Sequence, residues 1–357
     1  MNTVYFENLN SYSDLNLLLL KKTIGVAKPK IETIDVPGSS VPLDFTEFFG
    51  DIQYDTRKLK FDFGTYENLE NVFSMVQNKL NGQKLKVSLS EDPDYYYIGR
   101  VSVNDWSLDK IFGKFSIECD CEPYKYKNDV TIQSEHLCGK NLWSLSRQKE
   151  LMGSNMIEEI KDERHCLKYV KWVRIDMITN FNPNLQYTVS LDYFNQGGAG
   201  AYDEVIVVFK YDDETASYVK CREKDKWAHA TGTSIKGKKL TRIYLSNNAT
   251  TNESTPPSWV DIDTVQIEVG DTKTEYEPYK MISPKTVILN NNRQKVVPKV
   301  ITSQPITLKF DGVTATIEKN GTYTIPELVL SEGEKEITIE GTKDGTVVKF
   351  EYQEGSL

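Results

Sequence analysis

The sequence contains no long run of hydrophobic residues. Its longest purely aliphatic run is four leucines at positions 17–20, far short of the ~20 apolar residues that a membrane-spanning helix needs. The residues that precede this run lack the basic head of a signal peptide. We therefore expect a protein that is assembled in the cytoplasm, that has no membrane partner, and that leaves the cell only if another process exports it.

Blocks of basic residues are also missing. The 43 lysines and arginines are outnumbered by 52 aspartates and glutamates, and the net charge is -9. Proteins that bind nucleic acid usually present a concentrated basic surface to the phosphate backbone, and no local cluster provides one here. We therefore expect no nucleic-acid partner.

Cysteine is scarce, and its spacing does not suit a disulfide framework or a zinc site. The chain has five cysteines, an odd number, and none stands in the paired CxxC spacing of zinc sites. In FSIECDC, the side chains of Ile117, Cys119 and Cys121 fall on one face of an expected strand, where thiols behave as small core residues. We assign no metal ligands.

Motifs of catalysis are absent as well. The three histidines, His136, His165 and His229, stand in no motif that pairs histidine with a serine or cysteine nucleophile. No glycine-rich nucleotide loop and no EF-hand loop occurs. A glycosidase needs two facing carboxylates, and acidic residues spread over the whole chain neither identify nor exclude such a pair. We predict that the protein is not an enzyme and uses no cofactor.

What the sequence does contain is strand patterning over most of its 357 residues, a length that suggests more than one domain. Apolar and polar residues alternate in most of the segment 43–126. One helix is expected near 67–80, where apolar residues recur on a single face before the stop signal Asn81-Gly82. This face consists of Leu69, Val72, Phe73, Val76 and Leu80. Upstream, a Pro-Gly pair and a second proline in 35–45 predict a turn and an extended loop that protrudes as an arm.

Two further strand-rich segments follow. From 282 to the end, hairpins are indicated by Asp311-Gly312, Asn320-Gly321 and Asp344-Gly345, but this piece is too small to close a core without a further strand or a partner. From 136 to 279, the strands suffice for a two-sheet sandwich of their own. The letters EPYK end the first segment and the middle one, at 122–125 and 277–280, and we interpret the middle segment as an inserted domain.

The first part of the chain resembles a known family. The stretches DVPGSSVPLDFTEFFGDIQYDTRKLKFDF, LNGQKLKVSLSEDPDYYYIGRVSVNDW and CEPYKYK are similar, in this order, to the N-terminal domain of the distal tail protein (Dit) of siphophages that infect Gram-positive bacteria. The last seventy or so residues resemble that family's galectin-like C-terminal domain by hairpin pattern and position. The resemblance implies a homo-hexameric ring at the virion tail tip that joins the tail tube protein to the tail-associated fibre or lysin protein.

The middle segment resembles a second family. GKNLWSLSR, NLQYTVSLDY and VQIEVGDTKTEYEPYK are similar to phage-borne carbohydrate-binding modules of jelly-roll form. Such modules often hold a structural calcium ion, for which we assign no ligands here. The resemblance implies that the insert binds host cell-wall polysaccharide during adsorption.

Together these observations predict an all-β chain with one helix in the N-terminal domain. The expected domains are an N-terminal β-sandwich that forms the ring (1–127), a galectin-like C-terminal β-sandwich (128–135 and 281–357), and an inserted jelly-roll carbohydrate-binding β-sandwich (136–280). Two alternatives stay open. The insert is a structural spacer within the same hub, or the chain is a glycoside-acting enzyme with an accessory binding module.

Candidate sugar contacts follow from strand alternation. In LKYVKWVRIDM, Trp172 falls on the polar face, opposite Val173 and Ile175. An exposed aromatic ring there would stack on the apolar face of a sugar. In TRIYLSNN, Arg242 and Tyr244 likewise face away from the apolar side, so these three side chains are predicted to share a sheet surface. The alternative is that Trp172 packs beneath a loop, because tryptophan is highly buried on average.

Trp227 is the second candidate tryptophan. It stands among charged residues in EKDKWAHAT, a pattern that is typical of a loop. An exposed ring in a loop would be available to a sugar. Trp143 and Trp259 also lie in or near loop-like text, and for Trp143 we favour burial.

Overall fold

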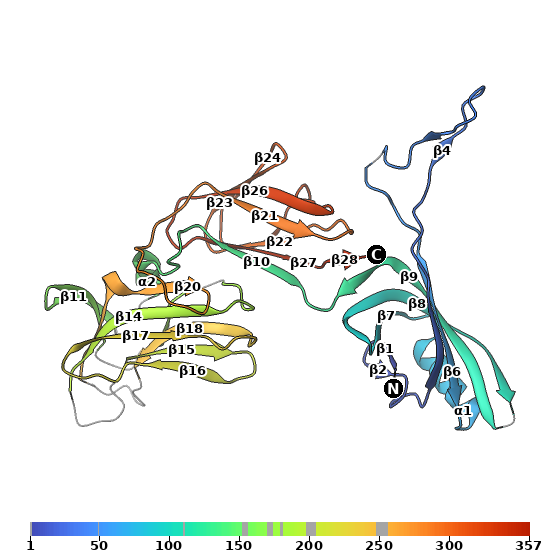
Figure 1. Ribbon diagram of the computed structural model, residues 1–357, viewed down its shortest axis with the longest axis horizontal. Coiled ribbons are helices and arrows are strands. Elements are labelled where there is room, and N and C mark those ends of the chain that lie inside the picture. The colour runs from blue at the N-terminus through green and yellow to red at the C-terminus, as the bar shows by residue number, and fades with distance from the viewer. Residues whose placement is uncertain are drawn as a thin grey trace.

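Figure 1 shows the computed structural model of the chain, which describes residues 2–48, 50–109, 111–151, 156–169, 174–178, 181–197, 205–247 and 256–357. The described residues form antiparallel sheets in sandwich-like layers. The predicted all-β fold class, with a helix in the N-terminal part, is confirmed. None of the helices in these ranges is long and apolar enough to cross a membrane.

The N-terminal sheet curves around its own core. Its strands, in spatial order, are β2 (Leu9–Asn10), β1 (Val4–Phe6), β7 (Lys84–Leu89), β8 (Asp92–Asp109), β9 (Phe112–Lys127), β6 (Arg57–Thr65) and β3 (Leu18–Ile24). Although three strands separate β1 from β6 in this order, the rings of Phe6 and Phe61 lie 6.2 Å apart between centroids. Contact between such distant strands requires the sheet to fold over, which encloses a sandwich-like core.

The predicted helix covers this core. Helix α1 (Leu69–Leu80) buries Leu69, Val72, Val76 and Leu80, four of the five residues of the expected apolar face, while Phe73 is half-buried against the same cluster. Asn68 caps the helix, since its side-chain oxygen accepts a hydrogen bond from the Asn71 backbone N–H at 3.1 Å. The apolar spacing and the cap together define where the helix starts.

A long arm projects from this domain (Figure 1). It comprises residues 25–56 and carries a short hairpin of β4 (Thr33–Ile34) and β5 (Leu43–Asp44). The protruding arm predicted from the prolines and the Pro-Gly pair is therefore present. Its apolar side chains are largely in solvent, with exposed fractions of 81% for Val26 and 69% for Ile31, Val41 and Phe48.

The middle unit is a sandwich of two sheets, which we call the β14 sheet and the β18 sheet. The β14 sheet contains β11 (Met156–Lys161), β12 (Arg164–Tyr169), β19 (Ser258–Asp261), β14 (Tyr187–Asn195), β17 (Trp227–Thr233) and β20 (Gln266–Val269). The β18 sheet contains β13 (Arg174–Asp176), β18 (Leu240–Asn247), β15 (Val205–Tyr211) and β16 (Ala216–Lys220). A short helix that the sequence did not predict, α2 (Leu145–Leu151), and a 3-10 turn, η1 (Ile262–Thr264), lie in the same unit.

The C-terminal unit also has two sheets around one core. The first contains β21 (Lys285–Asn291), β26 (Gly333–Gly341), β23 (Ile306–Phe310) and β24 (Val313–Ile317). The second contains β10 (Thr131–His136), β27 (Val347–Tyr352), β22 (Lys299–Thr302) and β25 (Gly321–Thr324). The further strand that this unit was expected to need is β10, which precedes the middle unit in the chain and pairs with β27 over its whole length.

The connections between the units are compact. The chain enters and leaves the middle unit side by side, because Cys138 and Met281 form an antiparallel bridge and the Gly139 N–H donates to the Lys280 carbonyl at 2.9 Å. The last strand, β28 (Gly355–Ser356), returns to the N-terminal sheet and pairs with β9.

Candidate functional site

The outer face of the β18 sheet gathers aromatic and cationic side chains. Along β15 and β18, residues such as Val207 and Leu245 point into the core of the middle unit, so their neighbours in sequence point outward. The strand register places Asp176, Tyr244, Val208 and Tyr218 in one row across four strands. We call this surface the β18 face. It consists of Arg174, Asp176, Ile206, Val208, Lys210, Tyr218, Lys220, Arg242, Tyr244 and Ser246. Ile206, Val208 and Ser246 are buried between the larger side chains, so the other seven residues supply the accessible surface.

Tyr244 lies between two guanidinium groups on this face. The Cζ atom of Arg174 is 4.6 Å from the centroid of the tyrosine ring, and that of Arg242 is 5.0 Å away. Arg242 donates from Nε to Asp176 Oδ1 at 2.8 Å, and this hydrogen bond raises the pKa of the guanidinium above its ordinary value. The ring is half-buried, and cation–π contacts of this kind hold the arginine side chains over it.

The structure brings two of the predicted sugar contacts together. Arg242 and Tyr244 are two residues apart on β18 and face the same side, as the alternation predicted. Trp172, the predicted third member of this group, lies outside the described residues. Its role stays a prediction.

Trp227, the remaining candidate, lies on the other side of the middle unit. It begins β17, and the register aligns it with Phe194 on β14 and Trp259 on β19, in a row on the outer face of the β14 sheet. The core of the middle unit therefore separates Trp227 from Tyr244. The sequence pattern did not predict this row, because the residues around Trp227 and Trp259 are typical of loops rather than strands.

The aromatic row on the β14 sheet is capped by paired cations. Arg164 lies 4.5 Å from the Trp227 centroid and Lys161 lies 4.1 Å from the Phe194 centroid. Arg164 forms ion pairs with Asp192 and Asp261, at 3.1 and 2.9 Å. The indole Nε1 atoms are also engaged, that of Trp227 by Asp162 and that of Trp259 by Glu159. These contacts satisfy the cations and the ring N–H groups within the surface itself.

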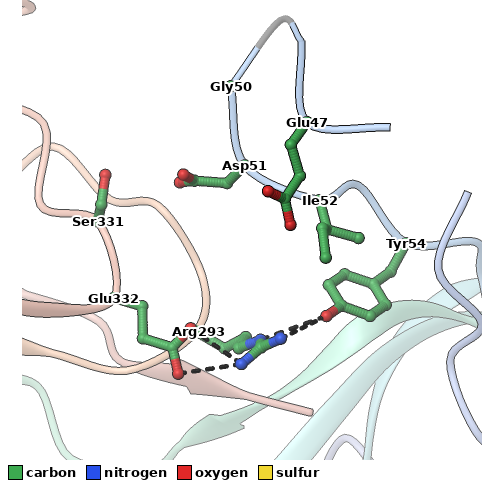
Figure 2. A pocket seen from close by; sticks show the side chains of 8 residues that line it. All are labelled: Glu47, Gly50, Asp51, Ile52, Tyr54, Arg293, Ser331 and Glu332. Atoms are coloured by element: carbon green, nitrogen blue, oxygen red, sulfur yellow. Dashed lines mark hydrogen bonds and ion pairs between the residues drawn. The ribbon is translucent and has the colours of Figure 1, made fainter. Parts of the chain in front are cut away.

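A cleft of about 620 Å³ lies where the arm meets the C-terminal unit (Figure 2). Arg293 reaches across it and donates to the hydroxyl of Tyr54 at 2.8 Å and to Glu332 at 3.0 Å. Beside it, Lys295 and Asp51 form an ion pair at 3.0 Å. Because Tyr54 and Asp51 belong to the arm, these contacts connect the base of the arm to the C-terminal unit.

The thiols and histidines show no catalytic arrangement in the described part of the chain. Burial raises the pKa of Cys121 and of Cys138 to about 12, which keeps both thiols protonated and weakly nucleophilic near neutral pH. His165 contacts Glu158, and His229 contacts Asp192 and Lys273. No group of three or more histidine, cysteine or acidic side chains within the described ranges could hold a metal ion.

No family model and no curated protein sequence matches the chain. Among solved structures, the chain is similar to the Dit protein of phage SPP1, described as a paradigm of the hub adsorption apparatus in phages that infect Gram-positive bacteria. The identity is 12% and the TM-score 0.32, over 75% of this chain and 99% of that one.

The chain is also similar to two structures that contain carbohydrate-binding modules. The tandem CBM22-1–CBM22-2 domain of Xyn10C from Paenibacillus barcinonensis shares 9% identity with a TM-score of 0.24, over 64% of this chain and 91% of that one. The CBM22-1–GH10 modules of a Clostridium thermocellum xylanase, in complex with xylohexaose, share 14% identity with a TM-score of 0.24, over 36% of this chain and 27% of that one. Because all these identities and TM-scores are low, the function is inferred below from the residues of this chain.

Proposed function

We propose that this chain is a structural hub protein of a phage tail, assembled in the host cytoplasm and located at the virion tail tip. Six copies form a ring between the tail tube protein and the tail-associated fibre or lysin protein, and the middle unit binds host cell-wall polysaccharide. The protein has no catalytic role in this proposal. The sequence resemblance to the Dit family supplies the copy number and the partners.

The exposed arm is the observation that supports formation of a ring. Along the arm, Val26, Ile31, Val41 and Phe48 are each at least 69% exposed, and the small two-stranded sheet of β4 and β5 does not cover them. Contiguous exposed apolar surface marks an interaction site. A contact between the arm of one copy and a different surface of the next copy is heterologous, and such contacts close into a ring when the rotation permits.

The side chains of the β18 face are the observation that supports saccharide binding. Tyr244 is half-buried with arginines on its ring, and Tyr218 is 55% exposed in the same row. Aromatic rings beside hydrogen-bonding groups are the combination that saccharide recognition uses. Weak binding at one site becomes firm attachment when several copies on one particle engage the same wall.

The spacer alternative has its own support. The middle unit contacts the C-terminal unit through Ser146 and Asp344, at 3.1 Å, and through the Tyr279 hydroxyl and the Gly345 N–H, at 2.7 Å. A unit fixed in this way also suits a rigid structural role.

Ring formation is tested by light scattering after size-exclusion chromatography. We expect a mass of six times the 40.8 kDa of the chain, and we expect the double variant Val41→Asp/Leu43→Asp in the arm to elute as a monomer. The matched control is Ile160→Asp, at a site that is 68% exposed on β11, which should leave the ring intact. A monomeric wild-type chain would contradict the hub.

Wall binding is tested by sedimentation with purified cell walls of Gram-positive hosts. We expect Tyr244→Ala, and also Trp172→Ala, to lower bound protein by about 5-fold or more, since stacking on one aromatic ring is worth about 1–3 kcal/mol where bases stack on such rings. The control is Tyr276→Ala, a tyrosine 41% exposed elsewhere in the middle unit. Full wall binding by both variants would favour the spacer, and cleavage of wall polysaccharide by the wild type would favour the enzyme.

A further inference from the structure

Among the described residues, the β18 face carries positive charge that its own carboxylates do not balance. Within the described ranges, Arg174 and Lys220 have no carboxylate within ion-pair distance, and Arg242 shares Asp176 with no other cation. Lys210 pairs with Glu214 at the edge of the face. This local excess stands out on a chain whose net charge is -9.

The outer face of the β14 sheet shows the opposite arrangement. There, Lys168 pairs with Glu159 at 3.1 Å, Arg164 with Asp192 and Asp261, and Lys161 with Asp162 at 3.5 Å. Both faces of the middle unit therefore present aromatic rings under cations, but on the β14 sheet each of these cations already has its counter-charge. An anionic ligand is therefore attracted electrostatically to the β18 face. On the outer face of the β14 sheet, the carboxylates that pair with these cations offset that attraction.

Arg174 and Lys220, which have no carboxylate partner among the described residues, lie beside the aromatic row. The register aligns Arg174 with Ser246, Ser246 with Ile206, and Ile206 with Lys220, directly alongside the row that contains Tyr244 and Tyr218. Since two strand spacings of about 4.8 Å separate β18 from β16, the two tyrosines lie about 10 Å apart. A polymer laid across the strands would meet both rings along one row and the cations along the next.

We propose that the β18 face selects an anionic polysaccharide, one that carries phosphodiester or carboxylate groups along its chain. This inference rests on the proposed saccharide binding and specifies its ligand. The guanidinium of Arg174 bonds two oxygens of a phosphate or carboxylate at once, the Lys220 ammonium binds the next anionic group, and Tyr244 and Tyr218 contact the sugar rings between them.

The experiment measures binding of the full-length chain to pairs of immobilised polymers that differ in charge alone. One pair is polygalacturonate and its methyl ester, and the other is a phosphorylated mannan and the same mannan after dephosphorylation. We expect the charged member of at least one pair to bind ~10-fold more tightly, and the difference to shrink when salt rises from about 50 to about 500 mM, because exposed charges are screened. The pair that shows the effect identifies the anionic group.

The variants Arg174→Gln and Lys220→Gln locate the charge selection. Each should lower binding of the charged polymer several-fold and leave binding of the neutral one unchanged. The matched control is Lys168→Gln on the β14 sheet, a lysine that already pairs with Glu159, and it should bind like the wild type. Thermal unfolding of each variant checks that the fold is retained.

The outcomes separate this inference from the function on which it rests. Equal binding of charged and neutral polymers overturns the anionic ligand and leaves saccharide binding standing. Charge selection that is lost in Lys168→Gln and kept in Arg174→Gln and Lys220→Gln overturns the assignment to the β18 face. Failure to bind any of the polymers and any host wall overturns both proposals.

Discussion

The hydroxyl group of Tyr169 is buried in the core of the middle unit, and no hydrogen-bond partner for it occurs in the described part of the chain. Burial raises the pKa of this phenol well above its usual range, so the group is a neutral donor with nothing to bond. Tyr187 provides the contrast, since its hydroxyl donates to the Asn182 carbonyl at 3.0 Å. An unsatisfied buried polar group costs about 1–3 kcal/mol.

We therefore expect Tyr169→Phe to raise the free energy of unfolding of the middle unit by about 1 kcal/mol. The matched substitution Tyr187→Phe should lower it by a similar amount or more, because it removes both the hydrogen bond that the hydroxyl donates to the Asn182 carbonyl and the one that it accepts from the Asn182 N–H. Urea unfolding followed by tryptophan fluorescence measures both. Destabilisation by Tyr169→Phe would show that the hydroxyl has a partner.

His136 makes stability depend on pH. It is the last residue of β10, and its Nε2 atom is buried with no hydrogen-bond partner among the residues that the structure describes. Burial, aided by the charge of Lys285, lowers its pKa from 6.5 to about 4. Between these two values the unfolded chain binds a proton that the folded chain does not. The stability contribution is therefore complete above pH 6.5 and is lost as the pH falls to about 4.

We expect the wild type to lose more stability than His136→Gln over this interval, by on the order of 2 kcal/mol, a value reduced from the full shift because the ring as a whole is only half-buried. Urea titrations at several pH values measure the difference. The control is Ser134→Ala on the same strand, a substitution that changes no ionisable group, and it should follow the wild type. A pH profile of His136→Gln that coincides with the wild type would contradict the burial argument.

Strand periodicity alone placed Arg242 and Tyr244 on one surface, because side chains alternate between the faces of a strand. It could not place Trp227, since the charged residues around it resemble a loop and the row that it forms with Phe194 and Trp259 depends on the pairing of three strands. Nor could it show which cations are paired. Arg164 meets Asp261 from 97 positions away in the sequence.

At the scale of elements, the arm depends on its base. Arg293 and Lys295 hold Tyr54 and Asp51 against the C-terminal unit, while the hairpin of β4 and β5 projects away from the sheets (Figure 1). We expect the double variant Arg293→Ala/Lys295→Ala to increase the rate of tryptic cleavage within residues 25–56 several-fold, because local release of backbone governs such cleavage.

The control for this test is Lys309→Ala, which removes an ion pair with Glu340 on the outer face of the C-terminal unit. It should leave cleavage of the arm unchanged. Equal cleavage rates in the wild type and the double variant would mean that the arm is held by other contacts.

Helix α1 and the hairpin turns were predictable because their signals are local: an apolar spacing, a cap, or a turn dipeptide within a few residues. The need of the C-terminal unit for another strand was also predictable from its small size. The predicted boundaries already assigned 128–135 to this unit, but the register of β10 could not be derived from periodicity, since the pairing joins Thr131 to Tyr352 across the whole middle unit.

At the scale of the whole molecule, the middle unit is separable from the rest. Cys138 and Met281 are bridged, and β10 stays with the C-terminal unit. Deletion of residues 139–280, with the ends joined by a short glycine-containing linker, should therefore leave both flanking domains folded. We expect the truncated chain to form the ring and to lose wall binding, as measured by light scattering and by sedimentation with cell walls.

The control is the full-length chain with Tyr244→Ala, which keeps the middle unit. It distinguishes the effect of losing the β18 face from the effect of removing the whole middle unit. Loss of the ring in the deleted chain would mean that the middle unit contributes to contacts between copies. Retention of wall binding by the deleted chain would move the saccharide site to one of the other units.

The return of β28 to β9 has a mechanical consequence. Gly355 and Ser356 pair with Tyr126 and Lys125, next to an ion pair of 3.2 Å between Lys127 and Glu354, so two antiparallel segments cross between the N-terminal and C-terminal units. A single connecting segment would allow the two units to rotate about its backbone bonds. Two segments that are hydrogen-bonded to each other restrict this rotation. When one unit is pulled from the other, β28 slides along β9 and its hydrogen bonds share the load in shear. If the proposed attachment to wall and tail holds, tension between them would load this joint along its two segments rather than bend it.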